Sequence, residues 1–230
     1  MNRYILFALA LLSSALTLAA QGFDMNAVEV DVKLHPERYR QLLDRFENAD
    51  TTLTVPQLAT VYFGYSFTPD YVAGESFVNV QDAYDSGDYV RAEELAAEAL
   101  KLNPVSLELS VLALAASDHL RSKGSYGKKI LDYGTRCDLI ATAILESGRG
   151  TSAASPFHVI AWSDVSRILR NVLGVERIVD RTKVGNIDAV KVIFPGSDRQ
   201  HILYFDNSRE ESPKKILCNY IKYSFHENIF

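Results

Sequence analysis

The chain contains five histidines, which are the side chains that most often bind metals or transfer protons near neutral pH. They are His35, His119, His158, His201 and His226. No two of them stand at the spacing of paired metal ligands, and neither an HExxH nor a CxxC motif occurs. The sequence therefore predicts no metal ligand.

A serine nucleophile and a phosphate-binding loop are the next candidates for chemistry. Many serine hydrolases carry GxSxG, but the nearest segment, Gly148-Arg149-Gly150, lacks the central serine. The segment also follows a predicted helix, and neither GKS nor GKT occurs, so it is no phosphate-binding loop. We favour a helix stop with a flexible linker; the alternative is a basic loop in which Arg149 contacts an anionic ligand. We predict no catalytic residue, no cofactor-binding residue and no cofactor.

The cysteines and the strand-end acids leave alternatives open. Cys137 and Cys218 could form a disulfide after export into an oxidising compartment. Cys137 also fits the inward stripe of a predicted helix, as expected for a buried free thiol. Asp180, Asp188 and Asp206 lie on or beside predicted strands, where we expect their carboxylates to be solvated.

Aromatic side chains crowd the segment YFGYSFTPDY at residues 62–71. They are Tyr62, Phe63, Tyr65, Phe67 and Tyr71. Core and inter-helix packing is the simpler interpretation. An aromatic ligand cleft is the alternative, and spacing alone does not support it.

The composition is that of an ordinary globular chain. Of 230 residues, 47% are hydrophobic and 23% are charged, and the length suits one large or two small domains. The 24 Lys and Arg residues against 29 Asp and Glu residues give a net charge of −5. Nucleic-acid binders usually show a basic surplus or patch, so we predict no nucleic-acid partner.

The first 20 residues have the organisation of a secretory signal peptide. Arg3 supplies the positive start, an uncharged and mostly apolar stretch covers residues 4–18, and the small residues Ala19 and Ala20 follow. A membrane-spanning helix needs about 20 apolar residues, whereas this run is shorter and precedes no basic stop-transfer cluster. We predict cleavage after Ala19 or Ala20, export to the periplasm or secretion, and no stable membrane span after removal of the signal.

The next stretch predicts one extended element and two helices. Residues 27–34 alternate between apolar and charged side chains, which is the pattern of a strand or an extended arm. A helix is predicted over residues 36–48, with a proline in its first turn. Thr54 and Gln57 have the spacing of a capping box and predict a second helix over residues 55–64.

Residues 76–104 resemble one tetratricopeptide unit, which is a pair of antiparallel helices. The residues that carry the resemblance are Gly87, Tyr89, Ala92, Ala99, Leu100 and Pro104. Gly87 allows the tight turn, the alanines let the partner helix approach closely, and Pro104 stops the second helix. The first half departs from the pattern, because Ser76 and Val80 stand where the Trp and Gly residues belong.

One such unit cannot bury both faces, so further helices must stack on it. Residues 107–120 are apolar almost all round, which indicates a helix buried on several sides. Another helix is predicted over residues 128–146. Gly124-Ser125-Tyr126 lies three residues later than the turn of a second repeat should, so we expect that repeat to be degenerate.

The composition changes after residue 146. The segment SGRGTSAASP at 147–156 is the best linker candidate, and a helix is predicted over 163–173. Three β-rich runs between 176 and 207, separated by turn residues, predict an antiparallel meander with that helix on one face. The tail after Pro213 suggests a short docking helix.

The predicted fold class is α+β, with N-terminal helical hairpins followed by a small antiparallel sheet and a packing helix. The expected domain organisation is a signal peptide at 1–20, a tetratricopeptide-like helical region at 21–150 and an α+β region at 151–230.

Several segments together resemble an uncharacterised family of exported bacterial proteins. They are YRQLLDRFENADTTLT, YFGYSF, GDYVRAEELAAEALKLNP, ILESGRGTS, FHVI and LYFDNS, and the likeness covers nearly all of the chain after the leader. The resemblance implies an exported bacterial protein with a domain of unknown function. It implies no activity and no functional residue.

Two functions fit these patterns. The first is a non-enzymatic protein–protein interaction or envelope scaffold module, whose partner is another envelope protein or a peptide, since stacked helix pairs form grooves for such partners. The second is a small-molecule binder or enzyme with a site between the helical and sheet parts, where pockets are common.

Overall fold

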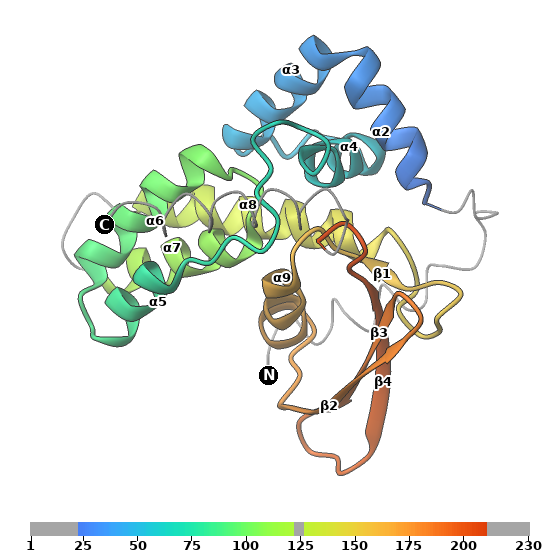
Figure 1. The fold of residues 1–230 in the computed structure, drawn as a ribbon. Coiled ribbons are helices and arrows are strands. Elements are labelled where there is room, and N and C mark those ends of the chain that lie inside the picture. Colours follow the sequence, from blue (N-terminus) through green and yellow to red (C-terminus); the bar gives the residue numbers. More distant parts are fainter. Residues whose placement is uncertain (1–22, 122–126, 211–230) are drawn as a thin grey trace, which may run out of the picture.

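The computed structural model describes residues 23–121 and 127–210 (Figure 1). The helices before the sheet are α2 (Met25–Leu34), α3 (Pro36–Glu47), α4 (Val55–Tyr65), α5 (Val78–Asp85), α6 (Tyr89–Leu102), α7 (Leu107–His119) and α8 (Gly127–Leu145). The elements that follow are β1 (Phe157–His158), α9 (Trp162–Arg167), the π-helical turn η2 (Ile168–Val172), β2 (Arg177–Val184), β3 (Ile187–Ile193) and β4 (Gln200–Asp206). The predicted α+β class is confirmed.

Some predictions concern residues outside the described ranges and stay predictions. They concern the signal peptide at 1–20, the turn at 124–126, Cys218, His226 and the tail after Pro213. In the described part of the chain, no helix has both the length and the apolar character needed to cross a membrane.

The prediction of a strand at residues 27–34 was wrong, because this segment forms α2. The Asp24 side chain caps the helix by accepting from the Asn26 amide at 2.9 Å. Val28 and Val32 are four residues apart, so they lie on one helical face and are buried, while Val30 is exposed. An alternating pattern also contains this four-residue spacing, and packing against α4 decides in favour of the helix.

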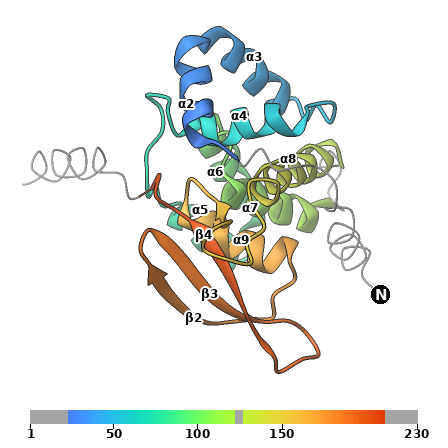
Figure 2. The ribbon, with the colours of Figure 1, turned by 90° about the vertical axis from the view of Figure 1, so that its right-hand side faces the viewer.

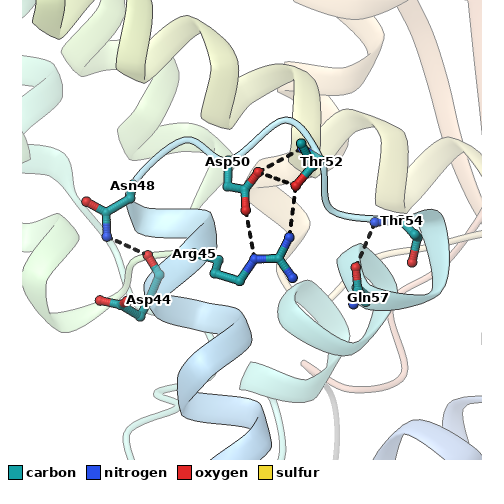
Figure 3. A network of polar contacts seen from close by, with 7 residues as sticks. All are labelled: Asp44, Arg45, Asn48, Asp50, Thr52, Thr54 and Gln57. Atoms are coloured by element: carbon teal, nitrogen blue, oxygen red, sulfur yellow. Dashed lines mark hydrogen bonds and ion pairs between the residues drawn. The ribbon is translucent and has the colours of Figure 1, made fainter.

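The connection between α3 and α4 is an ordered turn (Figure 3). Arg45 Nε donates to Asp50 Oδ2 at 2.7 Å, and the Thr52 amide and hydroxyl donate to Asp50 Oδ1 at 2.8 and 2.6 Å. These hydrogen bonds lower the pKa of Asp50 to about 2. Gln57 Oε1 accepts from the Thr54 amide at 2.9 Å, as the predicted capping box requires. Both predicted helices are confirmed.

Helices α5 to α8 pack as successive neighbours. The chain turns between α5 and α6 at Gly87, whose φ of +80° favours glycine, and Asp88 caps α6 by accepting from the Arg91 amide. Helix α6 packs on α7, α7 packs on α8, and α5 also contacts α7. Helices α2 and α3 pack on α4, which in turn packs on α8. The predicted helices over 107–120 and 128–146 are confirmed as α7 and α8.

The sheet has four strands in the order β1-β4-β3-β2. Strands β2, β3 and β4 are successive antiparallel neighbours, which confirms the predicted meander. The prediction of a purely antiparallel sheet was wrong, because β1 adds a parallel edge to β4 through the pair Phe157 and Phe205. This strand is only two residues long, so it has no periodicity that a sequence pattern could detect.

Within the described part of the chain, helices cover one face of the sheet (Figure 2). Val190, Val192 and Phe205 are buried on the inner face, whereas Ile202 on the other face is 46% exposed. Apolar side chains alternate on both faces of β4 and predict a strand covered on both sides; the exposure of Ile202 shows that this prediction was wrong for the described residues. Figure 2 shows the β2–β3 hairpin extending away from the helices, which explains why β2 is mostly exposed.

The predicted helix over 163–173 is present as α9 followed by η2, and it ends at Gly174 with a φ of +68°. Val165, Ile168 and Leu169 belong to the same hydrophobic cluster as the inner sheet residues, so the predicted packing of this helix on one face is confirmed.

The segment at 147–156 is anchored at both ends by backbone contacts, while residues 151–154 between them are exposed. The Gly150 carbonyl accepts from the Tyr204 amide of β4 at 2.8 Å, and the Gly150 amide donates to the Ser155 carbonyl at 2.8 Å. A Cβ on Gly148 would lie 1.9 Å from the Pro156 carbonyl oxygen. The flexible linker predicted here was therefore wrong, because these glycines permit close backbone approach. The domain boundary at residue 150 stays a prediction.

Candidate functional site

A small cavity lies at the junction of three segments: the α4–α5 connection, the residues just before α7, and residues 160–164 at the start of α9. We call it the junction cavity. Its walls include Tyr71, Glu75 and Phe77 from the α4–α5 connection, Asn103 and Ser106 before α7, and Asp164 of α9. Its interior volume is about 20 Å³, and the hollow with its solvent-open mouth measures about 320 Å³.

Hydrogen bonds from α4 and the α4–α5 connection fix the cavity walls. The Tyr71 hydroxyl donates to the Ile160 carbonyl at 2.5 Å, which ties the connection to the segment before α9. The Tyr65 hydroxyl donates to the Leu102 carbonyl at 2.6 Å, at the end of α6. These bonds join segments that are 89 and 37 residues apart in the sequence, so the cavity exists only in the folded chain.

Asp164 is the most unusual ionisable group of the site. It is 1% exposed, and its Oδ2 accepts from the Tyr62 hydroxyl at 2.6 Å. Its Oδ1 has no partner with hydrogen-bond geometry among the described residues. Burial raises the pKa of Asp164 to about 7, although the Tyr62 bond and the nearby amides of Leu107 and Glu108 oppose that rise.

Asn103 gives the cavity a second unsatisfied oxygen. Its Nδ2 lies 3.5 Å from Glu75 Oε2, a long hydrogen bond that orients the amide. Its Oδ1 is buried and has no partner among the residues that the structure describes. Buried polar atoms are rarely left unpaired, so two such oxygens at one small cavity indicate a ligand or ordered water.

Arg167 of α9 forms hydrogen bonds to two of the preceding helices, α5 and α7. Its guanidinium donates to Gln81 Oε1 of α5 at 3.0 Å and to Glu108 Oε1 of α7 at 3.3 Å. Helix α9 therefore packs beside α7, and Arg167 links it to α5.

The six residues with the tetratricopeptide spacing lie in the α5–α6 turn, within α6, or just after α6. Gly87 forms the α5–α6 turn and Tyr89 begins α6. Ala92 and Leu100 are buried, Ala99 is partly buried, and Pro104 is buried just after α6. None of the six residues lines the junction cavity.

The described histidines lie apart from one another. His158 Nε2 is 3.6 Å from Asp206 Oδ2, and burial lowers the pKa of His158. His119 stacks on the Tyr89 ring with centroids 3.9 Å apart. Within residues 23–121 and 127–210, no group of three or more His, Cys, Asp or Glu residues could hold a metal ion.

The other candidate residues from the sequence, Cys137, Arg149 and Asp188, lie outside the junction cavity. Burial raises the pKa of the Cys137 thiol to about 12, so this free cysteine is unreactive near neutral pH. Arg149 is exposed within the 147–156 segment. Asp188 is 1% exposed and accepts from Arg181 Nε at 2.7 Å, so its expected solvation was wrong.

The aromatic segment at 62–71 divides between two environments. Tyr62, Phe63 and Tyr65 are buried in the main core, as the packing interpretation predicts. Tyr71 lines the junction cavity. Asp164 was missed from the sequence, because an acid in the first turn of a helix is usually solvated, and its burial follows from segments about 100 residues away.

Comparison with known proteins identifies a family but no function. The model of a domain of unknown function, DUF4919, matches residues 27–215. No curated protein and no solved structure matches the chain.

Proposed function

Since the chain belongs to the DUF4919 family, whose function is unknown, we propose its function from the site: it is an exported, non-enzymatic binding and scaffold protein of the bacterial envelope. It holds one end group of a partner protein or peptide in the junction cavity. The α4–α5 connection, the residues before α7 and the start of α9 together position that cavity.

The observation that carries this proposal is the pair of unsatisfied oxygens at the junction cavity. Asp164 Oδ1 and Asn103 Oδ1 are both buried and accept no hydrogen bond of good geometry in the described part of the chain, although the Leu107 and Glu108 amides lie near the Asp164 carboxylate. A cavity of about 20 Å³ holds one small group, so it suits the end of a longer partner rather than a whole substrate with a cofactor.

The arrangement of the helices supports a scaffold role. Helices α5 to α8 pack in chain order, as tetratricopeptide-like units do, and Arg167 links α9 to α5 and α7. The stack then supports the C-terminal part of the chain, and the partner binds beside α9 in the junction cavity.

One observation favours a second function, an enzyme that uses Asp164 as a general acid or base. A carboxyl group with a pKa of about 7 at a cavity is suited to proton transfer near neutral pH. In that case product formation, rather than stable partner capture, would depend on the cavity.

A pull-down with a blocked cavity tests the proposal. Val72 lines the cavity mouth and is 42% exposed, so Val72→Trp should fill the mouth without disturbing the buried network. Val78→Trp is the matched control, because Val78 is 59% exposed on α5 and lies outside the cavity walls. The native envelope fraction supplies candidate partners, identified by mass spectrometry.

We expect the wild type and Val78→Trp to capture the same partner and Val72→Trp to lose it. Equal capture by all three proteins, or no specific capture by any, would contradict the proposal.

A further inference from the structure

Three side chains with acceptor oxygens, those of Asp164, Asn103 and Glu75, line the junction cavity. Asp164 Oδ1 and Asn103 Oδ1 accept no hydrogen bond of good geometry from the described residues, although the amides of Leu107 and Glu108 lie near the Asp164 carboxylate. Three acceptor groups around one small space are best satisfied by a ligand atom that carries several N–H donors.

The charges of the cavity favour a cation. Its lining residues include the carboxylates of Asp164 and Glu75 but no Lys or Arg. The nearest guanidinium on α9, that of Arg167, is bonded to Gln81 and Glu108. An anionic ligand would therefore meet two carboxylates, whereas a cation would be attracted by both.

The size of the cavity and the side chains that line it favour an alkylammonium over a metal cation. An interior of about 20 Å³ has room for one water-sized group, which is the size of an ammonium nitrogen. The Tyr71 and Phe77 rings suit a cation bound to an alkyl chain. A calcium ion would need about 6 to 8 oxygen ligands, and apolar residues such as Val72 and Val105 occupy much of this wall.

We propose that the junction cavity binds a primary ammonium group, carried by a small free amine or by a lysine side chain of a partner protein. Asp164, Asn103 and Glu75 accept its three N–H donors, and its alkyl chain leaves through the mouth beside Val72. This inference rests on the proposed function, because it names the chemical group that the junction cavity would hold.

The affinity should depend on pH through Asp164. The titratable groups that act on it are Tyr62 from α4, Tyr71 from the α4–α5 connection and Glu108 from α7. Glu75 lines the same cavity, and Arg167 of α9 is bonded to Glu108. Because the pKa of Asp164 is about 7, its attractive, ionised form increases as the pH rises past that value. Amine binding should therefore strengthen between about pH 6 and pH 8, while an alkylammonium stays protonated.

Calorimetric titration of the purified protein with n-butylammonium chloride tests the inference. Two matched probes are n-butanol, which has no charge, and butyltrimethylammonium, which has the charge but no N–H donor. We expect n-butylammonium to bind at least about tenfold more tightly than n-butanol or butyltrimethylammonium. The reason is that n-butylammonium alone of the three carries both the positive charge and N–H donors. Absence of saturable n-butylammonium binding, or equal binding of the three probes, would overturn the inference.

Variants assign the binding to this cavity. Asp164→Asn and Glu75→Gln should each weaken n-butylammonium binding at least about tenfold, whereas Glu98→Gln on the exposed side of α6 should not. If Asp164→Asn fails to fold, Glu75→Gln and the pH dependence of the wild type decide the question. Unchanged affinity in Glu75→Gln, or affinity that does not rise with pH, would overturn it.

Two further titrations distinguish the sources of the ammonium group. One uses 1,5-diaminopentane, and the other uses an N-terminally acetylated peptide with a single lysine, compared with the same peptide acetylated on Nε. Tighter binding of either probe than of n-butylammonium identifies that source. Partner capture that depends on the cavity, without n-butylammonium binding, would contradict the ammonium inference and leave the proposed function standing.

Discussion

At the scale of single residues, the described part of the molecule has two buried aspartates, Asp164 and Asp188. Asp164 has a raised pKa of about 7, so in the folded state it keeps a proton that the unfolded chain has already lost between about pH 4 and 7. Its contribution to the free energy of unfolding is therefore largest below that window and is lost as the pH rises through it.

We expect Asp164→Asn, which imitates the protonated form, to remove this pH dependence. The stability of the wild type relative to the variant should fall by roughly 4 kcal/mol between pH 4 and pH 8, which corresponds to about three pKa units. Urea unfolding of both proteins at the two pH values measures the difference. A constant difference across that range would show that Asp164 does not titrate as described.

Asp188 gives a second prediction, because its carboxylate accepts from Arg181, whose guanidinium lies 3.3 Å above the Trp162 ring. Asp188→Asn should cost about 1–3 kcal/mol of stability, since it weakens a charge-assisted bond at a buried acceptor. The solvated carboxylate expected from the sequence would instead make this substitution cost little stability. Asp180→Asn is the control and should change the stability by less than about 0.5 kcal/mol, because Asp180 is exposed. Equal denaturation midpoints for both variants would contradict the buried pair.

At the scale of elements, the segment between α8 and β1 is held by close packing of glycines. Gly150 and Gly185 have nearly equal φ values of +66° and +64°, so an alanine at either position meets similar backbone strain. Their surroundings differ: a Cβ on Gly150 would lie 2.0 Å from the Phe157 ring, whereas nothing lies within 4 Å of a Cβ on Gly185.

Gly185→Ala should therefore cost about 1 kcal/mol, and Gly150→Ala should cost at least about 2 kcal/mol more, because Phe157 must move from its place beside Phe205. Thermal unfolding of the two variants compares them directly. Similar melting temperatures would mean that the 147–156 segment is loose after all.

At the scale of the whole molecule, one hydrophobic cluster runs from α2 to β4. It contains Val28 and Tyr39 from the first helices as well as Val190 and Phe205 from the sheet. All the members of this cluster among the described residues lie after the predicted cleavage positions, so we expect the mature chain to keep them.

We expect N-terminal sequencing of the protein from its native envelope fraction to find a chain that starts after Ala19 or Ala20, because the first 20 residues have the region order of a signal peptide. Recovery of a membrane-embedded product that retains Met1 would contradict export with cleavage.

The amino-acid sequence by itself determined the features that depend on neighbouring residues. The capping residues Thr54 and Gln57 place the start of α4, Gly87 places the α5–α6 turn, and Gly185 with Asn186 places the β2–β3 hairpin. Each works through hydrogen bonds or backbone angles within a few residues, so the pattern alone was sufficient.

Only the tertiary structure decided the features that depend on distant contacts. Residues 27–34 became a helix because Val28 and Val32 pack against α4, and β1 became a strand because β4 offered it an edge. The candidate site belongs to this second group, since the burial of Asp164 requires Tyr62, which lies 102 residues away. A local pattern carries no information about such a contact, because desolvation is a property of the assembled surroundings.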